Sequence, residues 1–292
     1  MLKRFGLFML TNILVILTIT LIMYIVLPAI GMEPRGILGI AIFCGLFGMV
    51  GAFISLAISR WMAKRFYNIQ IIDDTVHDSS LRELKEIITR LSRQAGLPKT
   101  PEVGIYMSDE PNAFATGPSK SKSLVAFSSG LLASMSREEV EAVAAHEVSH
   151  IANGDMVTMT LLTGVANALV MFLARMIAMV LDNFLSDDDG GGLGFIGYIV
   201  VVMVLETVLM LLASIPLAAF SRYREFRADA GSAKLSSPQH MISALQTLGT
   251  LMEKPTKKDT FAMAKINSSR KVSLWATHPA LEARIDALQK MR

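Results

Sequence analysis

The stretch that decides the organisation of this chain is S-R-E-E-V-E-A-V-A-A-H-E-V-S-H-I-A-N-G-D, residues 136–155. Ser136 and Glu139 form a capping box, in which two side chains satisfy free amides at the start of a helix. Asparagine, glycine and aspartate at 153–155 mark its end, because glycine readily adopts the left-handed backbone that follows a helix. The stretch therefore predicts one helix that opens at Ser136, runs through Ile151 and breaks at 153–155.

This predicted helix carries an H-E-x-x-H motif, made by His146, Glu147 and His150. Residues four positions apart lie on one face of a helix, so both imidazoles can bind one metal ion. Glu147 then lies beside the metal, where it can accept a proton from an attacking water. This spacing is the one that zinc-protease chemistry requires. The plainer alternative is that the two histidines are ordinary surface residues of a soluble helix.

A catalytic zinc needs a third protein ligand and an open position for water. Glu225 is one candidate, and the remaining histidines are His77, His240 and His278. Asp229 follows Glu225 by four residues and shares its helix face, where it can accept a hydrogen bond from the outer nitrogen of a ligand histidine. The alternative is that the two carboxylates only balance the nearby arginines, which are Arg222, Arg224 and Arg227.

The composition indicates a membrane protein. Of the 292 residues, 52% are hydrophobic and 18% are charged, compared with roughly 45–50% and about 25% in soluble domains. The mean hydropathy is +0.47. So much apolar surface excludes intrinsic disorder, and the single cysteine, Cys44, excludes a disulfide framework.

Four apolar stretches are long enough to cross a bilayer as helices, which takes about 20 residues. They are residues 5–30, 36–59, 157–181 and 194–220. The sequence thus predicts four spans and a soluble unit that a membrane hairpin interrupts. We divide the chain accordingly into a membrane hairpin (1–65), the first half of a catalytic domain (66–156), a second hairpin (157–220) and the second half of that domain (221–292).

Basic residues set the predicted orientation of these spans. Lysine and arginine flank the N-terminus, the exit of the second stretch and the end of the fourth, whereas residues 187–192 are acidic and glycine-rich. Positive flanks stay in the cytoplasm, so we expect both termini and the long polar segments there. Because the basic residues follow the spans, the net charge of +3 does not indicate a nucleic-acid partner. Arg175 and Glu206 lie inside spans, and we expect them to pair, with a transport pathway as the alternative.

The polar segments have the pattern of an α+β unit. Ser80 and Glu83 indicate a second capping box, followed by a helix that ends before Gly96. Three strand-like runs follow at 103–107, 112–116 and 123–127. After the fourth apolar stretch, residues 241–252 and 279–291 have the pattern of amphipathic helices.

Four motifs make the chain resemble the HtpX family of integral-membrane zinc proteases, which serve the bacterial heat-shock response and are related to the eukaryotic CAAX-prenyl proteases. The motifs are N-A-F-A-T-G (112–117), H-E-V-S-H-I-A-N-G-D (146–155), S-R-Y-R-E-F-R-A-D-A-G (221–231) and T-H-P (277–279). With the four apolar stretches, the resemblance covers essentially the whole chain. One departure is Arg227, where many relatives have histidine, but that position is not a ligand in the family.

The resemblance implies an α+β fold with transmembrane helices and a zincin-like (gluzincin) catalytic domain at the cytoplasmic face. It implies that Glu225 completes, with His146 and His150, the site of one Zn²⁺ per chain. Glu147 would be the catalytic residue. The family's edge strand beside the active-site helix matches Asn112, Ala113, Phe114 and Ala115, and it would bind an extended substrate. The alternative for Phe114 is that its ring simply belongs to the core.

Peptide hydrolysis also forms an oxyanion, which needs a hydrogen-bond donor besides the metal. His278 and Tyr223 are the candidates in this chain. His278 precedes Pro279 at the start of a predicted helix, so a structural capping role is the alternative.

The residues therefore predict a membrane-bound zinc endopeptidase, and the resemblance implies that it lies in the bacterial inner membrane and degrades misfolded or damaged membrane proteins under stress. Its expected partners are unfolded or membrane-protein substrates, the lipid bilayer and other membrane quality-control proteases. The alternative is a membrane metal-binding or transport protein without hydrolytic activity, and a catalytically dead scaffold is a third interpretation. Glu147 distinguishes the first two, because a metal carrier has no need of a carboxylate beside its ligands.

Overall fold

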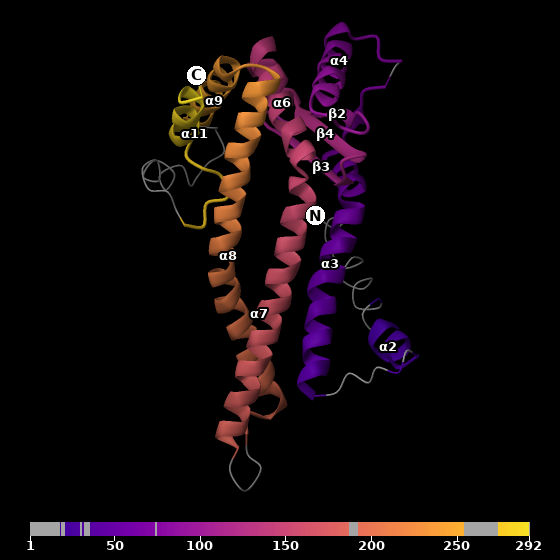
Figure 1. The fold of residues 1–292 in the computed structure, drawn as a ribbon, viewed down its shortest axis with the longest axis vertical. Helices are drawn as coiled ribbons and strands as arrows, with labels where there is room; N and C mark the ends of the chain where they lie inside the picture. Colours follow the sequence, from indigo (N-terminus) through magenta and orange to yellow (C-terminus); the bar gives the residue numbers. More distant parts are fainter. Residues whose placement is uncertain are drawn as a thin grey trace. The chain divides into compact units, whose positions relative to one another are not determined.

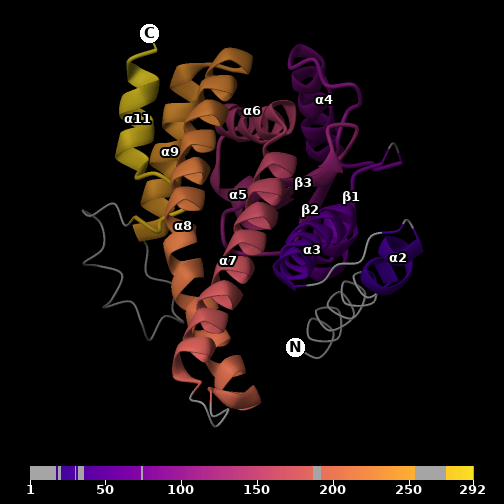
Figure 2. The ribbon, with the colours of Figure 1, turned by 60° about the horizontal axis from the view of Figure 1, so that its bottom comes forward.

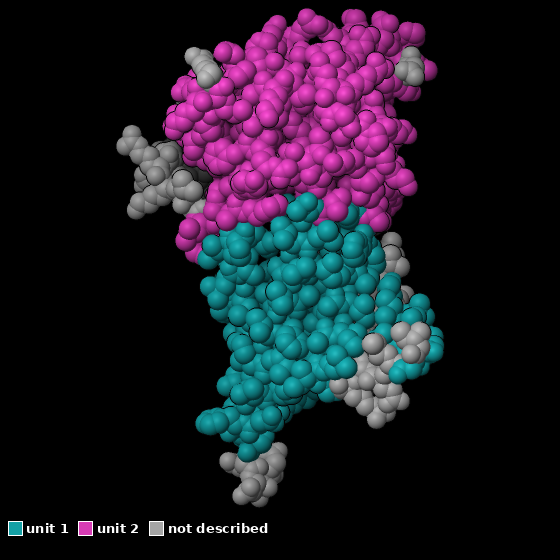
Figure 3. Space-filling model, viewed as in Figure 1, with its two compact units in different colours: residues 1–56, 158–217 teal, residues 57–157, 218–292 magenta. Residues whose placement is uncertain are grey.

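The computed structural model describes residues 18, 21–29, 31, 36–73, 75–186, 192–253 and 274–291. The chain divides into two compact units, one made of residues 1–56 and 158–217 and the other of residues 57–157 and 218–292 (Figure 3). Long apolar helices make up most of the described part of the first unit, and the second combines helices with a sheet. The expected α+β fold with apolar helices is therefore confirmed.

Three of the described helices are long and apolar enough to cross a membrane. They are α3 (Gly36–Tyr67), α7 (Asp155–Leu185) and α8 (Gly194–Leu235) (Figure 1). They contain the predicted stretches 36–59, 157–181 and 194–220. Two short helical segments precede them, η1 (Ile22–Val26) and α2 (Leu27–Ala29). Most of the predicted stretch 5–30 lies outside the described residues, so the count of four spans stays a prediction.

Small residues bring α3 and α7 into close contact. A Cβ atom added to Gly48 would lie 2.5 Å from the carbonyl oxygen of Gly164 and 2.8 Å from Cβ of Ala168. A Cβ atom on Gly164 would in turn lie 3.0 Å from Cβ of Ala52. Helices in lipid associate through such small residues, because dispersion contacts between close backbones replace the hydrophobic effect that drives packing in water.

The close contact at Gly48 predicts a stability effect. Gly48→Leu should force α3 and α7 apart and destabilise the protein by roughly 1–3 kcal/mol, as overpacked sites do. Thermal unfolding in mild detergent should show a lower Tm. Gly45→Leu is the matched control, because a Cβ atom on Gly45 meets nothing within 4 Å. Equal Tm values for the two variants would contradict the packing described here.

An ion pair links α7 to α8 within the first unit. Nη1 of Arg175 lies 2.6 Å from Oε1 of Glu206 and also donates to the carbonyl of Met171 at 2.9 Å. The predicted pairing of these two residues is confirmed. It has a clear physical reason, since each charge alone would be costly among apolar helices.

In the described part of the chain, four strands of the second unit form one sheet in the order β1-β2-β4-β3. They are β1 (Gln70–Ile71), β2 (Glu102–Tyr106), β3 (Ala113–Ser119) and β4 (Lys122–Ser128). β2 and β4 are parallel, whereas β3 and β4 form an antiparallel hairpin. The three predicted strand runs are confirmed as β2, β3 and β4, and β3 lies at an edge of the sheet. β1 has only two residues, too few for a sequence pattern.

Helices cover this sheet and supply the core of the second unit. Those described besides the ends of α3, α7 and α8 are α4 (Ser79–Gln94), α5 (Ser129–Ser134), α6 (Arg137–Asn153), α9 (Pro238–Glu253) and α11 (Leu281–Gln289). The two amphipathic helices predicted at 241–252 and 279–291 correspond to α9 and α11. Figure 2 shows α11 beside α9, and these two helices pack on each other.

The capping box predicted at the start of α4 is wrong. The helix begins at Ser79, and the carboxylate of Asp78 caps it by accepting hydrogen bonds from the amides of Ser80 and Leu81. Aspartate is as good an N-cap as serine, so the earlier acidic residue takes the position. Glu83 instead pairs with Arg137.

The helix that carries the H-E-x-x-H motif is fixed at both ends and along its length. Its capping box is confirmed: Ser136 accepts from the amide of Glu139, and the Glu139 carboxylate accepts from the amide of Ser136. At its other end Gly154 has φ of +74°. The Glu139 carboxylate also accepts from Ser243 at 2.6 Å and Thr247 at 2.7 Å, which ties α6 to α9. Since α6 also contacts α4, β3 and β4, its two histidines are held on a rigid element.

Candidate active site

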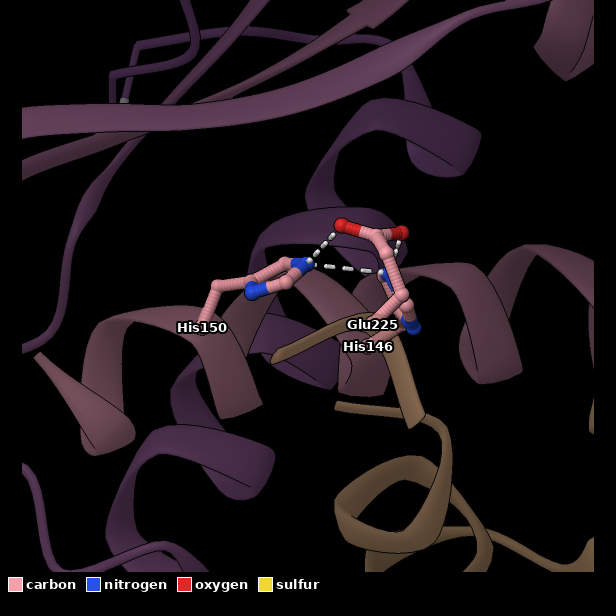
Figure 4. Close-up of side chains that lie close together, drawn as sticks. All are labelled: His146, His150 and Glu225. Atoms are coloured by element: carbon pink, nitrogen blue, oxygen red, sulfur yellow. Dashed lines mark hydrogen bonds and ion pairs between the residues drawn. The ribbon is translucent and has the colours of Figure 1, made fainter. Parts of the chain in front are cut away.

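Three side chains from α6 and α8 converge at one point of the second unit (Figure 4). Nε2 of His146 and Nε2 of His150 lie 3.1 Å apart. The two carboxylate oxygens of Glu225 lie 3.6 Å from Nε2 of His146 and 3.5 Å from Nε2 of His150. All three side chains are buried. The structure thus brings the two histidines and the glutamate together, although about 75 residues separate them in the chain.

These separations fit a metal ion. Four ligands arranged as a tetrahedron at about 2.0–2.1 Å from zinc lie about 3.3–3.4 Å from one another. The two Nε2 atoms lie 3.1 Å apart, and each lies 3.5 or 3.6 Å from a different oxygen of the Glu225 carboxylate. Two nitrogens and one carboxylate oxygen are also the donor types that zinc prefers. The group could therefore hold a metal ion with little movement.

The outer nitrogens of both histidines face carboxylates. Nδ1 of His150 lies 2.7 Å from Oδ2 of Asp155, and Nδ1 of His146 lies 2.9 Å from Oδ1 of Asp229, a close contact without hydrogen-bond geometry. A carboxylate beside Nδ1 favours the ring proton there, which leaves Nε2 of each ring available to bind a cation.

The electrostatics of the site also favour a cation. Burial lowers the pKa of His150, but contacts with the carboxylates of Asp155 and Glu225 outweigh it and raise the pKa to about 9. Burial likewise lowers the pKa of His146, and its contacts with Asp229 and Glu225 raise it above the usual value. The two imidazoles therefore lie in a strongly negative environment that attracts positive charge, whether protons or a metal ion.

Two residues at this site were not foreseen from the sequence. Asp155 is the first residue of α7 and directly follows Gly154. In the sequence, its position after Asn153 and Gly154 indicated only the end of a helix. Arg284 comes from α11 and binds Asp229 with two hydrogen bonds, Nε to Oδ2 at 2.7 Å and Nη2 to Oδ1 at 2.6 Å. An acidic residue shortly after a ligand histidine could have indicated Asp155, whereas nothing local indicates Arg284.

Asp155 allows a direct test of how the site is organised. Asp155→Asn should weaken metal binding by about 10- to 100-fold, because an amide holds the ring proton on Nδ1 less firmly and lowers the basicity of Nε2. Competition with a chromogenic chelator measures the change. Asp286→Asn, on the exposed face of α11, is the matched control. Unchanged metal affinity in Asp155→Asn would show that the contact with His150 does not tune the site.

The other candidate residues are placed as follows. Glu147 is buried and lies between the two histidines on α6. Nδ1 of His278 lies 3.2 Å from Oε2 of Glu225, and its side chain is 65% exposed, so the imidazole is accessible at the rim of the site. Tyr223 contacts Phe220 and Arg227 through its ring. Within the described residues, no contact joins the Tyr223 side chain to the three converging groups.

The candidate substrate strand begins just before β3. Asn112 precedes the strand; its backbone amide donates to Oγ of Ser128 and its carbonyl accepts from the amide of Ser128, both at 2.9 Å. Ala113 and Ala115 pack against the core that α6 shares. Phe114 lies in an aromatic cluster with its ring centroid 5.3 Å from Tyr67 and 5.8 Å from Tyr106. The Phe114 ring is thus engaged within the protein, while the backbone of β3 lies at the edge of the sheet.

A membrane protein with these apolar helices, and with an H-E-x-x-H helix facing a buried glutamate, has the features of a membrane-bound metallopeptidase. The model of peptidase family M48 matches residues 78–292, which is more than half of the chain. The chain therefore belongs to peptidase family M48, and it is a membrane-bound metalloprotease.

Curated relatives agree with this assignment. The chain is 48% identical over 290 residues to Protease HtpX of Shewanella sp. (strain MR-4), which covers 98% of this chain and 99% of the relative. It is also 48% identical over 291 residues, with the same coverage, to Protease HtpX of Aeromonas hydrophila subsp. hydrophila. The resemblance drawn from the four motifs is thus confirmed.

A solved structure supports the fold. The crystal structure of S. mikatae Ste24p matches with a TM-score of 0.61, covering 98% of this chain and 69% of that chain. The two sequences are only 19% identical, so this comparison supports the arrangement of the helices and the sheet alone.

Proposed function

We propose that this metalloprotease is a zinc-dependent endopeptidase that cleaves misfolded or damaged membrane proteins at the cytoplasmic face of the bacterial inner membrane under stress. The observation that carries the proposal is the convergence of His146, His150 and Glu225 with Glu147 beside them on the same helix. The proposed topology has four spans, at 5–30, 36–59, 157–181 and 194–220. Both termini and the two catalytic halves (66–156 and 221–292) would lie in the cytoplasm.

The proposed mechanism assigns one task to each group. His146, His150 and Glu225 would hold one zinc ion per chain, and Asp229 and Asp155 would orient the two imidazoles. When bound, zinc lowers the pKa of water to about 7 and polarises the peptide carbonyl. Glu147 accepts the proton of the attacking water and then donates it to the leaving amine.

Further donors would stabilise the oxyanion that develops on the carbonyl. His278 is the stronger candidate, because its Nδ1 is already within 3.2 Å of Glu225 and its side chain is accessible. Tyr223 remains a weaker candidate, since its ring contacts Phe220 and Arg227. A shift of the Tyr223 side chain on substrate binding would be needed to bring its hydroxyl to the site.

Substrate binding would use the run Asn112, Ala113, Phe114 and Ala115, through free backbone groups of the last three residues, because both backbone groups of Asn112 already pair with Ser128. A strand at the edge of a sheet has unpaired amides and carbonyls that an extended peptide can pair with. Affinity then comes from main-chain hydrogen bonds, which gives little sequence selectivity. Broad selectivity suits a protease that removes unfolded proteins.

Metal dependence is the first test of this proposal. The full-length protein, purified in mild detergent, should contain one zinc per chain by elemental analysis and should cleave unfolded casein. A chelator should abolish cleavage, and added zinc should restore it. Cleavage that persists after the metal has been removed would contradict the proposed mechanism.

A further inference from the structure

An open cavity of about 740 Å³ lies among the three long helices of the first unit. Its lining includes Gly48 and Ala52 of α3, Asn167 and Met171 of α7, and Glu206 and Met210 of α8. None of these residues belongs to the candidate active site. The cavity is therefore distinct from the candidate active site, and residues of the long apolar helices α3, α7 and α8 form it.

The polar groups of this cavity lie deep within the apolar stretches. At about 1.5 Å per residue, Glu206 is about 18 Å along α8 from Gly194, the first residue of the predicted fourth span, and Asn167 is about 15 Å along α7 from Val157, the first residue of the predicted third span. A hydrocarbon core is about 30 Å thick, so both side chains lie near its middle.

These groups retain hydrogen-bonding capacity. Oε1 of Glu206 accepts from Arg175, but within the described residues Oε2 of Glu206 has no further partner and the amide of Asn167 makes no side-chain hydrogen bond. Thr207 donates its hydroxyl proton to the carbonyl of Met203, which leaves the Thr207 oxygen able to accept. Acyl chains cannot form hydrogen bonds, and each unmet polar group in hydrocarbon carries a cost. An occupant with its own polar group would remove that cost.

The rest of the lining suits a helix of variable sequence. Met171, Met203 and Met210 also line the cavity. Methionine is unbranched and polarisable, and surfaces rich in it adapt to many partners.

We propose that this cavity binds a transmembrane helix of the substrate protein, with preference for a helix that has a polar side chain in the middle of its span. Asn167 and Glu206 would hydrogen-bond to that side chain, and the methionines would pack against the surrounding apolar residues. A polar residue in the middle of a span is costly in lipid until it finds a partner. The cavity would thus select unassembled membrane proteins. This inference rests on the proposed function, since it names the substrate class of the same protease.

A pair of matched substrates tests the preference. Both have the same unfolded soluble segment attached to a single span, and they differ in one central residue, asparagine or leucine. With the full-length protein in nanodiscs, kcat/KM should be about 3- to 20-fold higher for the asparagine substrate, the size expected for a hydrogen bond between helices in lipid. The readout is the ratio of the two kcat/KM values, because a general loss of activity lowers both values equally.

Asn167→Leu should reduce this ratio to about one. Asn183→Leu, the same change on an exposed part of α7 outside the cavity, should leave the ratio as in the wild type. A wild-type ratio of one, or a ratio that Asn167→Leu leaves unchanged, would overturn the inference. Casein, which has no membrane span, distinguishes failure of the cavity inference from failure of the proposed function. If the protein cleaves casein but the kcat/KM ratio of the two span-bearing substrates is one, only the cavity's role is wrong. If neither casein nor a span-bearing substrate is cleaved, the protease proposal fails as well.

Crosslinking tests the occupant without altering the polar groups. A benzophenone amino acid at Met210, in a Glu147→Gln background that traps substrate, should form adducts with the asparagine-bearing span. The same probe at Leu212, which is 58% exposed and outside the cavity lining, should not. Adducts at position 210 only with lipid, or only with residues 5–30 of the same chain, would show that another occupant fills the cavity and would overturn the inference.

Discussion

Glu147→Gln is expected to abolish casein cleavage while zinc remains bound at one per chain. Glutamine has nearly the same shape as glutamate but cannot accept a proton at neutral pH. Because loss of a general base typically costs about 10²- to 10⁴-fold in rate, kcat should fall by at least that range. The three groups that would hold the metal do not include Glu147, so elemental analysis should show no loss of zinc.

The control for this variant is Glu141→Gln on the same helix. Glu141 pairs with Arg90 at 2.8 Å, away from the converging histidines, so its activity should stay near that of the wild type. Substantial proteolysis by Glu147→Gln would remove Glu147 from its assigned role. Loss of zinc in that variant would mean that the carboxylate supports the metal site rather than the proton transfer. The same two measurements separate a protease from a metal carrier, because in a carrier neither substitution would change casein cleavage or zinc content.

The local part of the site could be predicted from the sequence because helix geometry is local. Capping signals at Ser136 and Gly154 bound the helix, and its period alone places His146 and His150 on one face. The strands β2, β3 and β4 were likewise predictable from short apolar runs between turn residues. What the sequence could not give directly was the partner of the two histidines, which required either a resemblance or the folded chain.

The long-range part of the site shows why sequence reasoning stops there. Arg284 reaches Asp229 from α11, 55 residues later in the chain, and no local pattern distinguishes it from a surface arginine. The sequence pattern at Asp155 indicates only a helix break. A residue that follows a helix end can also orient His150, and the pattern does not reveal this second role. At α4, two acceptable N-caps lay two residues apart, and Asp78 rather than Ser80 was used. Each miss reflects a choice that tertiary contacts make among locally equivalent options.

Glu225→Ala is expected to lose both the metal and the activity. Glu225 is buried, and its oxygens lie between the two imidazoles, with His278 at 3.2 Å. Removing a group that only orients a metal ligand costs about 10- to 100-fold in metal affinity, and loss of a ligand itself should cost more. Zinc content should therefore fall well below one per chain after dialysis, and casein cleavage should fall with it.

The charges around Glu225 predict a further consequence. Arg224 and Arg284 each lie 3.8 Å from its carboxylate, so without Glu225 these cations and the two histidines would lose one counter-charge and keep Asp229, Asp155 and Glu147. The metal-free variant should consequently unfold at a lower temperature than the metal-free wild type. Glu282→Ala, on the exposed first turn of α11, should change neither zinc content nor Tm. One zinc per chain in Glu225→Ala would mean that another group completes the site. His278 is the nearest imidazole that could do so, and the double variant Glu225→Ala/His278→Ala would then decide between them.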